Sequence, residues 1–243
     1  MRIVCSDINI FKSSFEAITK IVTEIQMEID SDGLRVDAID PSHVTFVHLD
    51  INEYEFDIFE CERPMKICFT TDEFLKYLKR INKDSIMELT VDDNYLTIKS
   101  EGNTNKTFKL KLIDLEYDTP PLPEIEYPIT IDMDTKLFKE IVKDIEGFSQ
   151  KVKIYNKGNF IRFEAFGDFS DVEIEYVYQN SISDTFSSVY DLEKISDMLK
   201  ADKFATKTHL SWGQDMPLLV EMKSENENEV LSFLLAPRIE EEF

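Results

Sequence analysis

Apolar residues recur every three or four positions near the start of each half of the chain. In the first half these residues are Phe11, Phe15, Ile18, Val22 and Ile25. In the second half they are Leu137, Ile141, Ile145 and Phe148. This spacing places the apolar side chains on one face of a helix. Each half is therefore predicted to open with an amphipathic helix.

Strands and turns follow each of these helices. In the first half a strand leads to a turn at residues 31–33 and continues at residues 34–38. In the second half residues 152–155 lead to a turn at 156–158, followed by residues 160–165. Apolar and polar residues alternate on both sides of Gly-containing turns. This pattern predicts one β-hairpin in each half.

A second helix and further strands complete each half. The helices are predicted at residues 71–81 and 191–200, and the strands at residues 86–91, 95–99, 208–212 and 218–223. Corresponding features lie roughly 120 residues apart, which suits a duplicated domain better than a solenoid. The predicted fold class is therefore α+β, with two similar domains of antiparallel sheet and two helices in each domain.

Prolines mark the boundary between the two halves. Four of the eight prolines in the chain fall within one short stretch, at Pro120, Pro121, Pro123 and Pro128. Proline has no backbone donor and restrains the preceding residue to extended conformations, so this stretch is predicted to be a semi-rigid connector. The expected organisation is an N-terminal domain at 1–113, a connector at 114–128 and a C-terminal domain at 129–243.

Composition narrows the functional classes. The chain has 49 acidic residues against 27 Lys and Arg, a net charge of −22, which excludes a simple basic DNA-binding module. No apolar run approaches the length of a membrane span, and we expect a soluble, intracellular protein that does not bind membranes. The three cysteines show no paired spacing, which argues against disulfides and structural zinc and predicts buried packing residues.

Cations nevertheless gather on the predicted helices. One group in the second helix comprises Lys76, Lys79, Arg80 and Lys83, and one in the third comprises Lys136, Lys139 and Lys143. These spacings predict a line of cations opposite the apolar stripe of each helix. The first and fourth helices are mixed, because Glu16 lies among the lysines of one and Asp197 among those of the other. A solvated helix face is the alternative interpretation.

Two predicted strands carry opposite charges. Lys109 and Lys111 alternate with apolar residues near the end of the first half, and Glu173 and Glu175 do so in the second half. If the two strands paired antiparallel, each cross-strand charge pair would contribute a few tenths of a kcal/mol. Pairing between subunits would be head-to-tail, giving a ring or a filament. Pairing with ordinary neighbours within the chain fits the pattern equally.

Signs of catalysis are absent from the sequence. The three histidines, His43, His48 and His209, and the scattered cysteines do not have metal-ligand spacing. The six glycines form no phosphate-binding loop, and no nucleophile motif occurs. We therefore expect a protein that is not an enzyme and uses no metal or cofactor.

Four runs of residues, taken together, resemble the archaeal and eukaryotic sliding clamps of the proliferating cell nuclear antigen family. They are Asp37-Ala-Ile-Asp-Pro-Ser-His-Val44, Leu110-Lys-Leu-Ile-Asp114, Pro217-Leu-Leu-Val-Glu221 and Leu235-Ala-Pro-Arg-Ile-Glu240. The resemblance covers the whole chain, with the runs in the same order and at compatible spacing. It implies the DNA clamp fold, in which three subunits and six domains close a ring with helices around a central hole and a continuous sheet outside.

The resemblance also implies a function and partners. The chain would be one subunit of a closed trimeric ring, a homotrimer or a mixture of related chains, that encircles duplex DNA without sequence preference. The ring would tether DNA polymerase and other replication and repair enzymes, including the clamp loader, a flap nuclease and a ligase, through short peptides containing a glutamine, an aliphatic residue and two aromatics. The expected location is an archaeal cytoplasm at the nucleoid, or the nucleus if the source is eukaryotic. The alternatives are a checkpoint-type clamp and an acidic interaction scaffold that does not bind DNA.

Three sets of site residues follow from the resemblance. The DNA-binding set is Lys12, Lys20, Lys76, Lys79, Arg80, Lys83, Lys136, Lys139, Lys143, Lys194, Lys200 and Lys203. The partner-peptide pocket is Ile39, His43, Val44, Leu122, Pro217, Leu234, Ala236 and Pro237. The subunit interface is Lys109 and Lys111 against Glu173 and Glu175.

Overall fold

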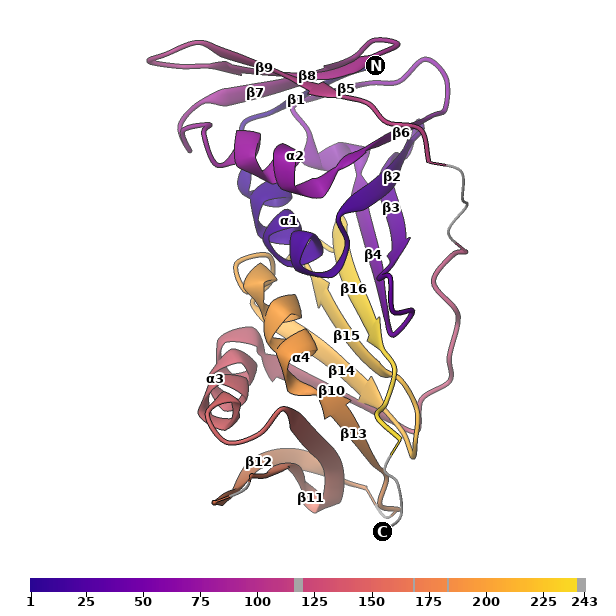
Figure 1. Ribbon diagram of the computed structural model, residues 1–243, viewed down its shortest axis with the longest axis vertical. Helices are drawn as coiled ribbons and strands as arrows, with labels where there is room; N and C mark the ends of the chain where they lie inside the picture. The colour runs from indigo at the N-terminus through magenta and orange to yellow at the C-terminus, as the bar shows by residue number, and fades with distance from the viewer. Residues whose placement is uncertain (116–119, 168, 183, 240–243) are drawn as a thin grey trace.

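Antiparallel sheets and four helices make up the chain. The computed structural model describes residues 1–115, 120–167, 169–182 and 184–239 (Figure 1). The helices lie on one side of the elongated molecule, and the long central sheet lies on the other. None of the helices within these ranges is long and apolar enough to span a bilayer.

The first half contains nine strands, two α-helices and one short 3-10 helix. In chain order they are β1 (Arg2–Cys5), α1 (Asn9–Ile21), β2 (Glu24–Ile29), β3 (Gly33–Ile39), β4 (Thr45–Asn52), η1 (Glu53–Glu55), β5 (Ile58–Glu60), β6 (Met65–Thr70), α2 (Thr71–Leu78), β7 (Ile86–Val91), β8 (Tyr95–Glu101) and β9 (Lys106–Lys111). The connector predicted at 114–128 lies between β9 and the next strand. Its residues 116–119 are outside the described ranges, and its bounds stay a prediction.

The second half repeats this order with fewer breaks. Its elements are β10 (Ile129–Asp134), α3 (Thr135–Glu146), β11 (Lys151–Phe166), β12 (Asp171–Ile182), β13 (Ser187–Asp191), α4 (Leu192–Met198), η2 (Leu199–Ala201), β14 (Lys207–Trp212), β15 (Leu218–Lys223) and β16 (Glu229–Leu235). The predicted α+β class with two similar domains is confirmed.

Three sheets connect these strands. The first has the order β5-β1-β7-β8-β9, and the third has the order β12-β11-β13. The middle sheet has eight strands in the order β10-β14-β15-β16-β4-β3-β2-β6. Four of them come from each half, and the halves meet where β16 pairs antiparallel with β4. One continuous sheet therefore crosses the boundary between the domains.

Cross-strand rows show that the two halves are built alike. In the first half, directly opposed residues form the row Ile3, Leu89, Ile98 and Phe108. In the second half they form the row Ile131, Leu210, Val220 and Phe233. These apolar rows run across β1-β7-β8-β9 and β10-β14-β15-β16 respectively. Strand β9 is therefore the counterpart of β16, and Phe108 is the counterpart of Phe233.

An ion pair across neighbouring strands identifies the counterparts of β3 and β4 in the second half. Arg35 on β3 is bonded to Asp50 directly across on β4. Arg162 on β11 is bonded in the same way to Glu175 on β12. The second part of β11 thus corresponds to β3, and β12 corresponds to β4.

The apolar faces of the helices form the core. Phe15 of α1 packs edge-on against Phe74 of α2, with ring centroids 4.7 Å apart, and both side chains are fully buried. At the start of α3 the Asp134 carboxylate accepts a hydrogen bond from the Leu137 N–H, which satisfies one of the free backbone donors. The spacing of apolar residues therefore predicted the buried side of the helices, but Leu137 of α3 is 37% exposed and lies outside the core.

The first helix ends earlier than its apolar spacing predicts. Val22 is already extended, with φ −133° and ψ 140°, and Ile25 lies on β2. The Thr71 hydroxyl donates to the Val22 carbonyl at 2.8 Å and fixes the chain where the helix stops. A contact from a residue 49 positions away thus overrides the local pattern.

The second helix also stops early, at Leu78 instead of Ile81. The Arg80 N–H bonds to the Tyr77 carbonyl and the Ile81 N–H to the Leu78 carbonyl, which form tight turns instead of another helical turn. The predicted helical line of four cations is therefore wrong beyond Lys79. Arg80 and Lys83 follow the helix, on exposed turns.

The hairpin predicted around residues 156–158 is wrong, because β11 continues through it as one strand. The Asn156 side chain is fully buried and bonds the backbone of Asp184 and Phe186. Gly158 has φ 63° and lies at a register shift, so it forms a bulge. The turn-forming residues therefore bend a strand instead of reversing it.

Three smaller expectations have mixed outcomes. The predicted hairpin at 31–38 and the strands at 86–99 and 208–223 are confirmed. Phe148 lies beyond α3 and is 45% exposed, so it is not part of the helical core. All three cysteines are free, but only Cys5 is buried, and burial raises the pKa of its thiol to about 12.

A pair of carboxyl groups lies across the junction between the halves. Glu229, at the start of β16, is 5% exposed and shares a hydrogen bond with Glu55 of η1. Glu55 also accepts a hydrogen bond from the Asn228 amide at 2.9 Å. Burial, followed by the charges of Glu55 and Asp7, raises the pKa of Glu229 to about 7. Both carboxyl groups line a hollow of about 440 Å³, which is also lined by Lys203.

Replacing Glu229 with Gln is expected to stabilise the protein above pH 7 by up to about 3 kcal/mol, because Gln keeps the hydrogen bond and does not ionise. The folded-state pKa lies above the ordinary 4.5. The stabilisation from the protonated group is therefore complete below pH 4.5, falls as pH rises, and is lost above about 7. Urea unfolding at pH 5 and pH 8 measures the difference. The exposed Glu225→Gln is the matched control, and parallel pH dependence in all three proteins would contradict the assignment.

Candidate functional site

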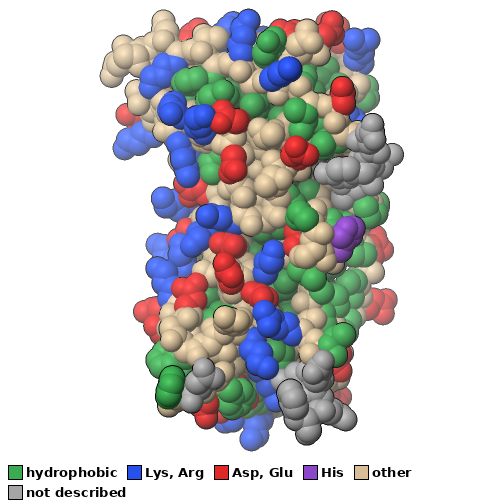
Figure 2. Space-filling view, in the orientation of Figure 1, with side chains coloured by type: hydrophobic (Ala, Val, Ile, Leu, Met, Phe, Trp, Pro, Cys, Tyr) green, Lys and Arg blue, Asp and Glu red, His purple; other side chains and the backbone are tan. Residues whose placement is uncertain are grey.

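The four helices form one continuous row. Helix α1 packs against α2 on one side and against α4 on the other, and α4 packs against α3. The order α2-α1-α4-α3 therefore runs along one side of both domains (Figure 1). Figure 2 shows Lys and Arg side chains gathered along the edge that carries these helices, with acidic side chains among them.

Nine of the twelve cations of the predicted DNA-binding set are exposed. They are Lys20, Lys76, Lys79, Arg80, Lys83, Lys136, Lys143, Lys200 and, in the turn after η2, Lys203. Lys76 is bonded to Glu73 one helical turn away, at 2.6 Å. An exposed pair of this kind contributes little to stability and exchanges readily with an incoming anion.

The other three cations of that set are partly buried and already engaged. Lys12 donates to the Ile81 carbonyl at 3.0 Å, and burial lowers its pKa. Lys139 lies 2.9 Å from Asp202. Lys194 lies 3.1 Å from Asp40, which belongs to the other half of the chain. The row of helices therefore brings the predicted cations to one side but does not leave all of them free.

A separate apolar hollow of about 300 Å³ lies beside the junction of the two halves. Of the predicted pocket residues, it is lined by Ile39, His43, Val44, Pro217, Leu234 and Ala236. Leu122 and Pro237 are half-buried and do not line it. Sequence reasoning missed Thr45, Phe46, Pro120, Pro121 and Pro123. The prolines flank Leu122 in the connector, which was the available signal for them.

The segment between β3 and β4 forms one wall of this hollow. His43 has φ 57°, a left-handed conformation, and its side chain is exposed. Val44 is 37% exposed, and its carbonyl accepts a hydrogen bond from the Ala236 N–H at 2.8 Å. An apolar surface built from both domains is thus held open beside the connector.

Strands β9 and β12 are both sheet edges. Among the described residues each pairs with only one strand, β9 with β8 and β12 with β11, so they are not neighbours within the chain. Phe108 of β9 is half-buried and stacks on Tyr77 at 5.0 Å. On β12 the acidic Glu173 and Glu175 are both within ion-pair distance of Arg162.

The described residues contain no group of acidic, His or Cys side chains that could hold a metal ion. His48 is bonded to Asp37 at 2.7 Å and His209 to Asp132 at 2.5 Å, each across neighbouring strands. These histidines are structural partners in the sheet. The surfaces that carry the predicted site residues are the helix row, the apolar hollow and the edge strands β9 and β12.

Comparisons with known proteins agree over the whole chain. The model of the N-terminal domain of proliferating cell nuclear antigen matches residues 3–120, and the model of its C-terminal domain matches residues 121–238. A protein named DNA polymerase sliding clamp from Methanothermobacter thermautotrophicus is 42% identical over 238 residues, which cover 98% of this chain and 97% of that protein. One of the same name from Methanobrevibacter smithii is 40% identical, over 97% of this chain and 96% of that protein.

Solved structures show the same fold. A chain in the PCNA2-PCNA3 complex from Sulfolobus tokodaii superposes with a TM-score of 0.90 at 25% identity, over 99% of this chain and 100% of that chain. The proliferating cellular nuclear antigen from Entamoeba histolytica gives 0.89 at 23% identity, over 98% of each chain, and supports the fold alone.

Proposed function

Because the chain belongs to the proliferating cell nuclear antigen family, we propose that it is a DNA sliding clamp whose copies close head-to-tail into a ring around duplex DNA. One observation supports the proposed ring. The edge strands β9 and β12 are the counterparts of β16 and β4, the two strands that pair at the junction of the domains. The junction within the chain is therefore a template for the contact between copies.

The template can be read residue by residue. Within the chain, Phe233 of β16 lies opposite Val47 of β4, which in turn lies opposite Ala38 of β3. The counterpart of Phe233 is Phe108. The counterpart of Val47 is Val172, which lies opposite Ala165. Pairing β9 of one copy with β12 of the next thus places Phe108 against Val172 and continues the same apolar row.

The template also fixes the charges of this contact. Leu234 lies opposite Phe46 at the internal junction. Their counterparts are Lys109 on β9 and Asp171 on β12, with Glu173 diagonally beside them. The proposed charge pair is therefore Lys109 with Asp171. The sequence predicted Glu173 and Glu175 as the acidic partners instead.

Head-to-tail pairing closes a ring when the rotation at each junction returns to the start. If the contact between copies repeats the internal junction, each copy adds two equivalent joints, and six domains in three copies pair every β9 edge with a β12 edge. The number three, and a ring built from identical copies, rest on the family. The helix row of every copy would then line the hole, since it lies on one side of a continuous sheet.

Charge explains how such a ring could slide. A net charge of −22 opposes general attachment to phosphate, whereas exposed lysines on the helix row attract it locally. Contacts of this kind are independent of base sequence and are weakened by salt. Retention on DNA therefore comes from encirclement, and the binding energy stays low enough for movement.

The apolar hollow is the proposed partner site. Its volume and its wall of apolar side chains suit a short peptide with an aliphatic and two aromatic residues. DNA polymerase, the clamp loader, a flap nuclease and a ligase are the partners proposed for it. The chain itself carries out no catalysis in this proposal, and its location is the archaeal cytoplasm at the nucleoid. A checkpoint-type clamp or a scaffold that does not bind DNA is the alternative that the experiments below distinguish.

The charge pair between copies is tested by reversal. Lys109→Glu places a carboxylate opposite Asp171 and is expected to convert rings to monomers at micromolar concentration, because like charges in opposed positions repel. Adding Asp171→Lys should restore rings. Native mass spectrometry and sedimentation give the mass. Lys207→Glu on the internal strand β14 is the control, and an unchanged mass for Lys109→Glu would place the contact elsewhere.

Shortening two pocket side chains tests the partner site. The probe is a fluorescent peptide with a glutamine, an aliphatic residue and two aromatics. The double variant Val44→Ala, Leu234→Ala is expected to weaken its binding about tenfold or more, because each truncation removes apolar contact worth roughly 1 kcal/mol. Leu122→Ala with Pro237→Ala is the comparison, since neither residue lines the hollow. A larger loss in the second double variant would refute the pocket boundaries given by the structure.

Encirclement is tested on DNA of defined topology. Clamp loaded onto nicked circular DNA is expected to stay bound in moderate salt and to leave after one cut, because only closure retains it. Alanine at Lys79, Lys136 and Lys143 should reduce loading and flatten its salt dependence by about 0.9 per lost phosphate contact. Alanine at the strand residues Lys157, Lys207 and Lys223 is the matched control. Retention on cut DNA would refute encirclement, and failure to load at all would favour the scaffold.

A further inference from the structure

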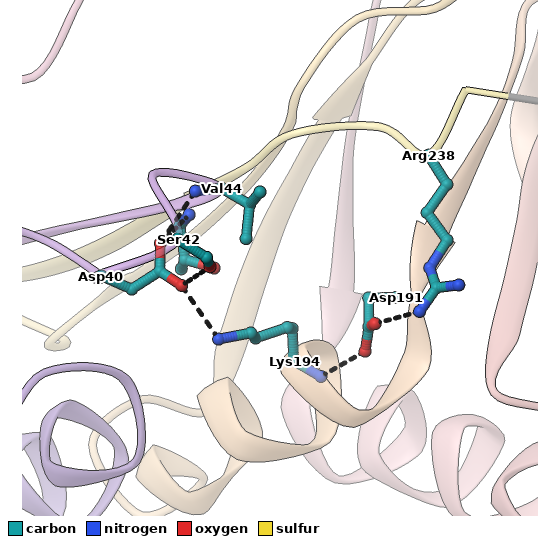
Figure 3. A network of polar contacts seen from close by, with 7 residues as sticks. Asp40, Ser42, Val44, Asp191, Lys194 and Arg238 are labelled. Carbon is teal, nitrogen blue, oxygen red and sulfur yellow. Dashed lines mark hydrogen bonds and ion pairs between the residues drawn. The ribbon is translucent and has the colours of Figure 1, made fainter.

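A buried carboxylate lies at the base of the segment that walls the apolar hollow. Asp40 directly follows β3, and its side chain is only 2% exposed. It accepts hydrogen bonds from the backbone N–H groups of Val44 and Thr45 at 2.8 and 2.7 Å, and from the Ser42 hydroxyl (Figure 3). These bonds close residues 40–45 into a compact loop that presents Val44 to the hollow.

The remaining contact of Asp40 comes from the other half of the chain. Lys194, in the first turn of α4, donates from its Nζ to Asp40 Oδ2 at 3.1 Å. The backbone N–H of Lys194 is held by Asp191, the residue that caps α4. Asp191 also pairs with Arg238, which follows β16 (Figure 3). One polar chain therefore links the loop, the helix and the segment that supplies Ala236 to the hollow.

The energetics of this carboxylate depend on its partners. Burial alone raises the pKa of Asp40, but the hydrogen bonds from Ser42, Thr45, Lys194 and Val44 outweigh it, and the pKa lies below its ordinary value. The group is therefore ionised at neutral pH. A buried charge that loses its only cationic partner is costly, and the loop can lower that cost by opening to water.

This ion pair does not belong to the duplicated framework. Asp40 follows Ile39, and the corresponding residue after Phe166 is Gly167. Helices α2 and α4 begin with equivalent backbone hydrogen bonds. The Thr71 N–H donates to the Thr23 carbonyl, and the Leu192 N–H donates to the Gln150 carbonyl. By this alignment the counterpart of Lys194 is Glu73. Glycine and glutamate cannot make the pair, so it is particular to the junction beside the hollow.

We propose that Asp40 and Lys194 are positioning residues for the partner site: their ion pair across the domain junction holds the 40–45 loop in the shape that receives a peptide. This inference rests on the proposed function of the hollow. It also removes Lys194 from the DNA-contacting set, because its ammonium group is turned to the loop.

Removing the charge of Lys194 while keeping its length tests the inference. Lys194→Met is expected to weaken peptide binding about tenfold, mainly through faster dissociation, and to speed hydrogen exchange at the Val44 and Thr45 amides. Lys194→Arg keeps the charge and should retain most of the peptide affinity and most of the protection of the two amides. Lys200→Met, which removes an exposed lysine from the same helical segment, should change neither. Loading of Lys194→Met on circular DNA should keep the salt dependence of the unchanged protein.

A second variant separates positioning from general stability. In Lys194→Met, adding Asp40→Asn removes the unpaired charge, so the double variant should bind peptide more tightly than Lys194→Met alone. If Lys194→Met leaves peptide affinity and both amides unchanged, or acts only by flattening the salt dependence of loading, the inference is wrong. If the unchanged protein binds no peptide, the proposed partner site fails, and amide exchange still decides whether the pair holds the loop.

Discussion

Every backbone donor and acceptor at the edge of a sheet needs a partner, and this requirement organises the chain. At the domain junction it is met by β16 and β4, which pair over seven residues and join two four-stranded halves into one sheet. The pairing buries Leu231, Phe233 and Leu235 almost completely. It also fixes where everything else lies, since the helices pack on one side of the joined sheet and the apolar hollow forms at the end of the junction. The same requirement remains unmet at β9 and β12, and the proposed pairing between copies would satisfy it.

Local sequence pattern predicted the elements well wherever neighbouring residues decide the structure. The hairpin around Gly33 follows from strict alternation and an Asp-Gly turn, and Gly33 has φ 149°. Pattern failed where a distant group intervenes. Asn156 resembles a turn former, but its side chain bonds the backbone of Asp184 and Phe186, and β11 continues through the position with a bulge instead of reversing. No window of sequence contains that partner.

The residues of the candidate site likewise divide into those that local sequence predicts and those that distant contacts place. Lys136 and Lys143 are exposed as their spacing predicts, because a helix face is a local property. Lys194, on the mixed fourth helix, was expected in the same set, yet it turns to Asp40, 154 residues away. The pocket residues carried over from the family reached six of the eleven lining positions, because the motif around His43 and Val44 is local. The prolines that complete the wall come from the connector, whose path depends on the packing of both domains.

Two buried carboxyl groups at the ends of the β16–β4 pairing show how the junction uses charge. At one end Glu229, opposite Ile51, faces other carboxyls and has a raised pKa. At the other end Thr45, opposite Leu235, donates to Asp40, whose pKa is lowered by donors from both domains. Ionisation therefore weakens one end of the junction as pH rises towards neutrality, whereas the Asp40 end is already ionised and paired. Since the hollow lies at the Asp40 end, its shape should be insensitive to pH over the range in which the opposite end loosens. The two ends of the domain junction thus depend on different carboxyl groups, although a single pair of strands carries both.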